Sequence, residues 1–330
     1  MSEARPQTST QAMQCMEVWG GSQLVSAGVE FSGLRAWVYS KPFGQARAGG
    51  DVYYASSCAT GRITRLLLAD VSGHGQPVAA TAADLRTLMR RFVNRLDQTE
   101  FVRLLNRNFA ALSRQGSYAT AVVATFFAPT RRLSVCNAGH PRPLIYRTAT
   151  QQWDFLGAQE APPSPRLANI PLGLIGFSEY DQFEIEMEPG DFVVAYSDAL
   201  IESRDADGEM LGEEGLLRLA RLLGDVEAHR IIGALLGEIA ERYPENLSED
   251  DVTVMVVHAN GRETKYPLAQ RLRALARLAA SVVRAIDPRA ERAPLPDARL
   301  ANVGGAILPA LSRRWRAPRS EPAASRAREK

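Results

Sequence analysis

The chain of 330 residues has little cysteine and no long apolar run. Its three cysteines, Cys15, Cys58 and Cys136, are scattered, and no CxxC pair occurs. This pattern argues against a zinc–thiolate site and a disulfide framework, and it indicates a reducing compartment. No apolar run approaches the roughly 18–20 residues that a membrane span needs. Residues 1–14 are polar and lack the apolar core of a signal peptide. We therefore expect a cytoplasmic protein.

Charge is unevenly distributed along the chain. Residues 261–330 hold 16 Lys and Arg against 6 Asp and Glu, whereas the first 260 residues hold 23 against 31. With 45% hydrophobic and 23% charged residues, the composition is that of a globular protein without internal repeats. We expect a loose leader over 1–24, one domain over 25–260, and a basic C-terminal extension over 261–330 that is part helical and part disordered.

Hydrophobic periodicity predicts many strands and four helices. The strands are expected at 27–41, 52–56, 62–69, 118–127, 132–137, 143–147, 183–187, 192–197 and 252–258. The helices are expected at 77–93, 99–114, 213–223 and 226–242, and residues 158–169 are expected to form a loop. Thr99 and Asp225 are the expected N-caps of the second and fourth helices. Strands joined by tight turns, with the helices in two pairs, favour an α+β sandwich over a doubly wound sheet.

Aspartates stand at the ends of several predicted strands. They are Asp51, Asp70, Asp198, and either Asp250 or Asp251. A single aspartate at such a place is more often a turn or cap residue. Several carboxylates brought together by a sheet, however, supply the oxygen ligands that Mg²⁺ and Mn²⁺ prefer. The sequence therefore predicts a shared divalent-metal site, and hydrolysis by metal-activated water is the leading hypothesis.

Five motifs occur in the order found in one known family. They are Gly49-Gly50-Asp51-Val52-Tyr53, Ala69-Asp70-Val71-Ser72-Gly73-His74-Gly75 before an alanine-rich helix, Asn137-Ala138-Gly139-His140-Pro141, Ser197-Asp198-Ala199-Leu200-Ile201-Glu202-Ser203, and Asp250-Asp251-Val252-Thr253. Over roughly residues 28–258 the chain resembles the bacterial metal-dependent protein phosphatases of the sporulation and stress-response type. These form the bacterial branch of the protein phosphatase 2C (PPM) family. One motif alone is a weak signal, and the order of the five makes the resemblance specific.

This resemblance implies a four-layer αββα sandwich, in which helix pairs flank two antiparallel sheets. It also implies two Mn²⁺ or Mg²⁺ ions at one edge and hydrolysis of phosphoserine or phosphothreonine. By the family pattern, Asp70 bridges both ions, the Val71 carbonyl completes one coordination sphere, Asp198 and Asp250 hold the second ion, and Asp51 acts through one ion or its waters. The implied substrate is a phosphorylated STAS-type anti-anti-sigma regulator. The alternative is a catalytically inactive relative that binds such a regulator.

The chain departs from the family pattern at one motif, and the pattern does not identify the general acid. The fourth motif usually reads Ser/Thr-Asp-Gly, and here Ala199 replaces the glycine, which puts the backbone geometry beside Asp198 in question. Related eukaryotic enzymes carry a histidine two residues after the bridging aspartate, whereas this chain has Ser72 there. His74 and His140 are therefore both candidates for the general acid. The simpler explanation of each histidine is that it belongs to a tight turn.

The basic extension contains one candidate amphipathic helix at 266–286. Such a helix can dock on the acidic domain, contact an anionic membrane surface, or bind nucleic acid. No named nucleic-acid motif supports the last of these. Control of the activity is expected from an activating protein or from homodimer contacts of the helices at 77–93 and 99–114.

Overall fold

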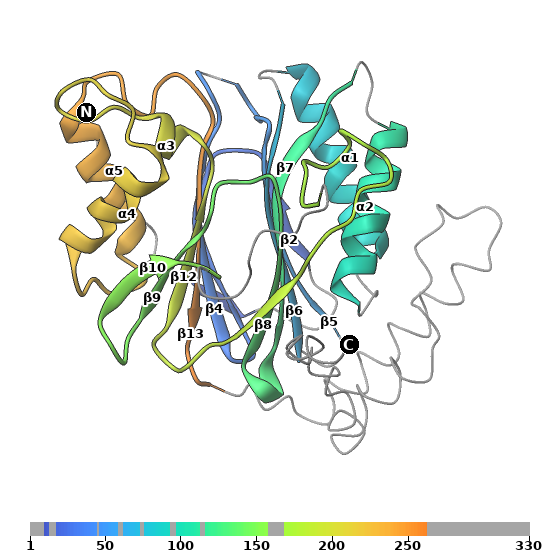
Figure 1. The fold of residues 1–330 in the computed structure, drawn as a ribbon, viewed down its shortest axis with the longest axis horizontal. Coiled ribbons are helices and arrows are strands. Elements are labelled where there is room, and N and C mark those ends of the chain that lie inside the picture. Colours follow the sequence, from blue (N-terminus) through green and yellow to red (C-terminus); the bar gives the residue numbers. More distant parts are fainter. Residues whose placement is uncertain are drawn as a thin grey trace, which may run out of the picture.

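The computed structural model describes residues 10–12, 18–44, 46–58, 62–72, 76–92, 97–112, 116–157 and 168–262. Two β-sheets stack face to face, and helices cover both outer faces (Figure 1). The predicted α+β class and four-layer αββα sandwich are confirmed. No helix within these described ranges is long and apolar enough to cross a membrane.

One sheet has seven strands and the other has six. In spatial order, the first consists of β1 (Thr10–Ala12), β3 (Val25–Phe31), β4 (Leu34–Lys41), β13 (Val252–Ala259), β12 (Phe192–Tyr196), β9 (Leu144–Arg147) and β10 (Gln152–Phe155). The second consists of β11 (Phe183–Glu186), β8 (Arg132–Ala138), β7 (Ala119–Phe127), β6 (Ile63–Val71), β5 (Asp51–Cys58) and β2 (Val18–Gly21). Neighbouring strands are antiparallel except that β1 runs parallel to β3.

Helices lie outside each sheet. Helices α1 (Gln76–Phe92) and α2 (Gln98–Leu112) cover the six-stranded sheet. Helices α3 (Ala199–Glu202), α4 (Gly212–Leu223) and α5 (Ile231–Arg242) pack against the seven-stranded sheet. A third apolar layer fills the space between the sheets. Alternate residues of each strand enter different layers, so Tyr53 and Leu68 point between the sheets, whereas Val52 and Leu67 point toward α1 and α2.

The N-terminal segment contributes to both sheets. Residues 1–24 were expected to form a loose leader, but β1 pairs with β3, and β2 pairs with β5. The expectation of a leader is therefore wrong for these two strands. The three residues of β1 and the four of β2, which include two glycines, show too little periodicity to be recognised as strands.

Other differences concern element boundaries. The single stretch expected at 27–41 is two strands, because Gly33 turns the chain with a φ of +77°. Asp97, not Thr99, caps α2, since its carboxylate accepts a hydrogen bond from the Glu100 amide at 2.8 Å. Asp225 does not cap α5. That helix starts at Ile231, and the Asp225 carboxylate accepts a hydrogen bond from the Tyr146 hydroxyl instead. Most of the loop expected at 158–169 and the helix expected at 266–286 lie outside the described residues.

Candidate metal centre

Asp51 and Asp70 face each other across two neighbouring strands. Asp51 begins β5, Asp70 lies at the end of β6, and the strand register places the two residues directly opposite one another. Directly opposed side chains on one face of an antiparallel pair lie about 4.5–5.5 Å apart at Cβ. The strand alternation turns both carboxylates toward the gap between the sheets, on the same side as Tyr53 and Leu68. They therefore form the half of the site that the six-stranded sheet contributes.

The other half comes from the seven-stranded sheet. Asp198 follows β12 and precedes α3, and Asp250 lies just before β13, which pairs with β12. Asp70 shares a side-chain hydrogen bond with Asp198 and is repelled by the charges of Asp198 and Asp250. Because Asp51 is also repelled by Asp70, the four predicted carboxylates lie at the same end of the sandwich, with Asp70 interacting with each of the others. Within the described ranges, no group of three or more Asp, Glu, His or Cys side chains is arranged as a complete set of metal ligands.

The pKa values record this crowding of negative charge. Burial, followed by repulsion from Asp198 and Asp250, raises the pKa of Asp70 to about 8. Burial, followed by repulsion from Glu202 and Asp250, raises the pKa of Asp198 to about 6. Burial, followed by repulsion from Asp70, raises the pKa of Asp51 well above its usual range. Each shift means that the ionised carboxylate is unfavourable here unless a positive charge stands nearby.

Asp51 also carries an unsatisfied oxygen. The residue is 2% exposed, and its Oδ2 atom has no hydrogen-bond partner among the described residues. Ser197 and Thr253 form hydrogen bonds that favour its charged form, but these do not outweigh the burial. Buried polar atoms without partners are rare and costly in proteins. An oxygen-only donor set with an orphaned buried carboxylate oxygen fits a hard divalent cation.

Asp251 has a structural role that differs from that of its neighbour Asp250. Its buried carboxylate accepts hydrogen bonds from the backbone amides of Phe43 at 2.6 Å and Gly50 at 2.5 Å, and a longer one from Asp51 at 3.4 Å. A Cβ atom on Gly49 would collide with this carboxylate, so the glycine permits the close approach. Asp251 therefore fixes the loop that presents Asp51. Asp250 is half-buried and takes part in the repulsion around Asp70 and Asp198.

Ala199 is accommodated without backbone strain. It is the first residue of α3, it is buried, and it is not among the residues with a positive φ. The Asp198 carbonyl accepts hydrogen bonds from the Ile201 and Glu202 amides, each at 2.8 Å, so the chain turns into a helix directly after Asp198. An alanine favours this helical backbone more than a glycine does. The replacement of the family glycine therefore leaves the local geometry intact.

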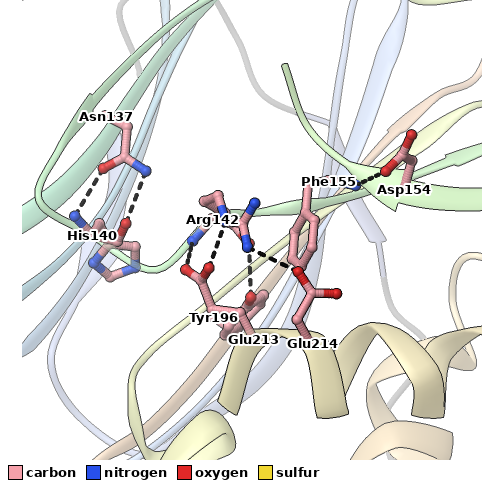
Figure 2. A network of polar contacts seen from close by, with 8 residues as sticks. All are labelled: Asn137, His140, Arg142, Asp154, Phe155, Tyr196, Glu213 and Glu214. Atoms are coloured by element: carbon pink, nitrogen blue, oxygen red, sulfur yellow. Dashed lines mark hydrogen bonds and ion pairs between the residues drawn. The ribbon is translucent and has the colours of Figure 1, made fainter. Parts of the chain in front are cut away.

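His140 lies in a rigid turn beside the centre. The Asn137 side chain accepts a hydrogen bond from the His140 amide at 2.8 Å and donates one to its carbonyl at 2.9 Å (Figure 2). The ring Nδ1 shares a hydrogen bond of 2.9 Å with Thr120 Oγ1, and Thr120 stands opposite Asp70 in the β6–β7 register. Burial lowers the pKa of His140 to about 4, which the Tyr196 carbonyl offsets only in part. The imidazole is therefore neutral at pH 7 and positions Thr120. His74 lies outside the described residues.

A polar network connects this turn to the strand that carries Asp198. The Tyr196 hydroxyl donates a hydrogen bond of 2.7 Å to the Arg142 carbonyl (Figure 2). The Arg142 guanidinium pairs with Glu213 at 2.5 Å and Glu214 at 3.3 Å at the start of α4, and it lies 3.7 Å above the Phe155 ring. Because Tyr196 is two residues before Asp198, these contacts hold the end of β12 against α4. The sequence gives no motif for this network, whose members are brought together only by the fold.

A pocket borders the half of the centre that comes from the seven-stranded sheet. Ala199, Arg204 and Asp250 are among the residues that line it. Asn246, another lining residue, accepts a hydrogen bond from the Arg204 amide at 2.7 Å and donates one to its carbonyl at 2.8 Å. The wall of the pocket is thus fixed, and the pocket offers space directly beside a carboxylate of the centre.

Comparison with known proteins identifies the family. Residues 60–260 match the sequence model of the family described as Stage II sporulation protein E (SpoIIE). The chain belongs to the SpoIIE family. This family consists of phosphatases of the 2C type, so the predicted resemblance to sporulation and stress-response phosphatases is confirmed. A comparison with curated proteins gives no match.

Solved structures of related domains share the SpoIIE-family fold. The RsbU and RsbW domains of Rv1364c from Mycobacterium tuberculosis align with a TM-score of 0.58 and 23% identity, over 80% of this chain and 76% of that one. The phosphatase domain of SpoIIE from Bacillus subtilis, solved with a fragment of its regulatory domain, aligns at 0.55 and 16%, over 74% and 64%. The SiaA phosphatase domain of Pseudomonas aeruginosa aligns at 0.55 and 16%, over 68% and 84%. At these identities the alignments show the fold alone.

The raised pKa values give a testable dependence of stability on pH. Asp70, with a folded pKa of about 8, is protonated in the folded chain and ionised in the unfolded chain between pH 4 and pH 8, because an unfolded aspartate has a pKa of about 3.9. Unfolding then releases a proton, so the stability of the metal-free protein should fall as pH rises through this window. Thermal denaturation in EDTA at several pH values measures the slope.

Saturating Mg²⁺ should remove most of this slope, because metal binding requires the ionised carboxylates. Asp70→Asn should also give a shallower slope in EDTA than the unmodified protein, which separates this group from all other titrating groups. Equal slopes for the two proteins would contradict the assignment of a raised pKa to Asp70.

Proposed function

We propose that this SpoIIE-family chain is a metal-dependent protein phosphatase that hydrolyses phosphoserine and phosphothreonine with two Mn²⁺ or Mg²⁺ ions. One observation carries the proposal. Asp51 and Asp70 from one sheet and Asp198 and Asp250 from the other crowd together at one end of the sandwich, with raised pKa values at the first three. Bound cations are often the largest charges in a site and reverse such shifts. The oxygen-only donor set favours hard ions over zinc.

The position of each residue indicates its role. Asp70 interacts with both Asp51 and Asp198, so it would hold the metal ions at the middle of the site, and the Val71 carbonyl would be an additional ligand. Asp198 and Asp250 are the proposed ligands of the second ion. Two bound ions of this kind supply an activated water and neutralise charge on the phosphoryl oxygens.

The surrounding residues hold these ligands in place. Asp251 fixes the loop before Asp51 through backbone amides, and Ser197 and Thr253 contribute hydrogen bonds to Asp51. His140 is neutral at pH 7 and its Nδ1 is shared with Thr120, so we assign it a positioning role and not that of general acid. Each of these side chains approaches from a strand end or a hydrogen-bonded turn, which keeps the centre rigid.

The proposed substrate is a phosphorylated STAS-type anti-anti-sigma regulator in the cytoplasm. Fold similarity to an RsbU domain that was solved together with an RsbW domain supports a regulatory protein as the substrate. The few scattered cysteines support a reducing compartment. We also propose control by an activating protein or a homodimer, and weak membrane contact through the basic extension. Residues 263–330 lie outside the described ranges.

Turnover of a phosphorylated STAS protein, with and without EDTA, tests the proposal. We expect phosphate release with Mn²⁺ or Mg²⁺, loss of release in EDTA, and recovery when metal is added in excess. The small substrate p-nitrophenyl phosphate should follow the same metal dependence. If the protein binds the phosphorylated regulator but releases no phosphate from either compound at any metal concentration, the inactive binding module is the correct alternative.

A further inference from the structure

An exposed apolar surface lies on the side of the molecule that carries α2. Eight large apolar side chains are exposed in the described part of the chain, and four of them belong to three neighbouring segments. These four, Leu112, Tyr118, Leu174 and Phe177, are called the apolar patch. Phe177 is 89% exposed and Leu174 is 53% exposed. Contiguous apolar side chains on a surface mark interaction sites more often than single ones do.

The apolar patch is built on a fixed framework. The buried Asn106 of α2 donates a hydrogen bond of 2.8 Å to the Ile175 carbonyl and accepts one of 2.8 Å from the Gly173 amide. Positions 173 and 176 lie against Phe109 and Ala110 of the same helix. In Figure 1 the yellow-green segment that contains these residues runs beside α2. The contacts of residues 173, 175 and 176 with α2 thus hold Leu174 and Phe177 in place on the surface.

The apolar patch is continuous with the metal centre. Ala119 and Leu172 exchange two backbone hydrogen bonds, of 2.8 and 2.7 Å, and the next residue of β7, Thr120, stands opposite Asp70. Tyr118 is held to Ser72, two residues after Asp70, by hydrogen bonds in both directions. At about 3.4 Å per residue, Tyr118 lies about 7 Å along the strand from the level of Asp70.

We propose that the apolar patch docks the folded protein that carries the phosphoserine or phosphothreonine, through an apolar surface next to its phosphorylated residue. This inference rests on the proposed function. A protein whose phosphate reaches Asp70 must cover the adjacent surface, and Phe177 offers it an aromatic anchor of the kind that dominates binding energies. A stable dimer buries about 800 Å² on each partner. Four side chains supply only part of that area, which fits a transient substrate better than a second copy.

Two substrates of different size test the proposal. Phe177→Ala and Leu174→Ala in the full chain should each lower kcat/KM for a phosphorylated STAS protein by about 10-fold or more, mainly through KM, because interface anchors are worth at least that factor. Turnover of p-nitrophenyl phosphate should stay unchanged, since this compound is too small to reach the apolar patch. Leu222→Ala is the matched control, because Leu222 is 78% exposed on α4, which covers the other sheet. It should alter neither activity.

Every other outcome overturns the inference and is distinguishable from failure of the proposed function. Unchanged kinetics on both substrates would show that the apolar patch does not contact the substrate. Equal losses on both would show that the substitutions disturb the metal centre. A dimer in light scattering that Phe177→Ala converts to a monomer, with unchanged kcat/KM, would assign the surface to a second copy. If the unmodified protein hydrolyses neither substrate with metal, the proposed function itself fails.

Discussion

Asp70→Asn should abolish the phosphatase activity and leave the metal-free protein at least as stable as before. Asp70 would hold the cations, which would contribute several kcal/mol to stabilising the transition state. A loss of about 4 kcal/mol corresponds to a roughly 10³-fold fall in kcat/KM. Stability moves in the opposite direction because the asparagine no longer carries a charge that Asp198 and Asp250 repel. Steady-state kinetics in saturating Mn²⁺ and thermal denaturation in EDTA at pH 8 measure the two effects.

The opposite signs distinguish a functional carboxylate from a structural one. Replacement of a structural aspartate would lower the activity and the stability of the protein together, since both depend on the same fold. Asp207→Asn is the control, because Asp207 is exposed in the turn before α4 and should change neither quantity. If Asp70→Asn retains more than a tenth of the activity, the carboxylate is not the metal ligand that we propose. If the metal-free variant is markedly less stable, the repulsion around Asp70 has been misjudged.

The sequence predicted the α+β class because its central strands are long apolar runs, and the resemblance to the family implied the four layers. Strand β6 is a nine-residue run that is buried on both faces, and β13 is a similar run of eight, so each is visible without its partners. The short strands β1, β2 and β10 were missed because three or four residues show little periodicity, whereas β9 and β11, of similar length, were expected within the longer stretches 143–147 and 183–187. Asp225 was taken for a helix cap, and a contact with Tyr146, 79 residues away, accounts for it instead.

The part of the candidate site that could be predicted consists of the aspartates in motifs at strand ends. The sequence placed Asp51, Asp70 and Asp198 at the borders of strands, where a sheet can bring them together. It did not indicate the supporting contacts, since the hydrogen bond between Thr120 and His140 and the pairing of Arg142 with Glu213 join segments that only the tertiary fold brings close. The choice between Asp250 and Asp251 was open to one further argument. Strand alternation places Asp251 on the same face as Thr253, toward the gap between the sheets, where its carboxylate is used by the Gly50 and Asp51 amides.

Asp251→Ala should therefore mainly lower the free energy of unfolding, whereas Asp250→Ala should mainly weaken metal binding. Removal of the Asp251 carboxylate leaves the buried amide of Gly50 and that of Phe43 without their acceptor. Each such loss costs about 1–3 kcal/mol, so the free energy of unfolding should fall by about 3 kcal/mol or more. Removal of the half-buried Asp250 carboxylate loses the hydrogen bond of 2.7 Å from the Asp251 amide but relieves repulsion on Asp70 and Asp198, so stability should change by less than about 1 kcal/mol.

Metal affinity should be weakened more by Asp250→Ala than by Asp251→Ala. Loss of an outer contact to a metal ligand weakens affinity about 10–100-fold, and loss of a direct ligand should reach at least the upper end of that range. Asp250→Ala should thus need about 100-fold more Mn²⁺ for half-maximal turnover, whereas Asp251→Ala, assayed well below its melting temperature, should need no more than about 10-fold. Urea denaturation and metal titration of turnover give the two measurements. A stable Asp251→Ala with the larger metal defect would exchange the roles of these neighbours, and Asp251 would then be the metal ligand.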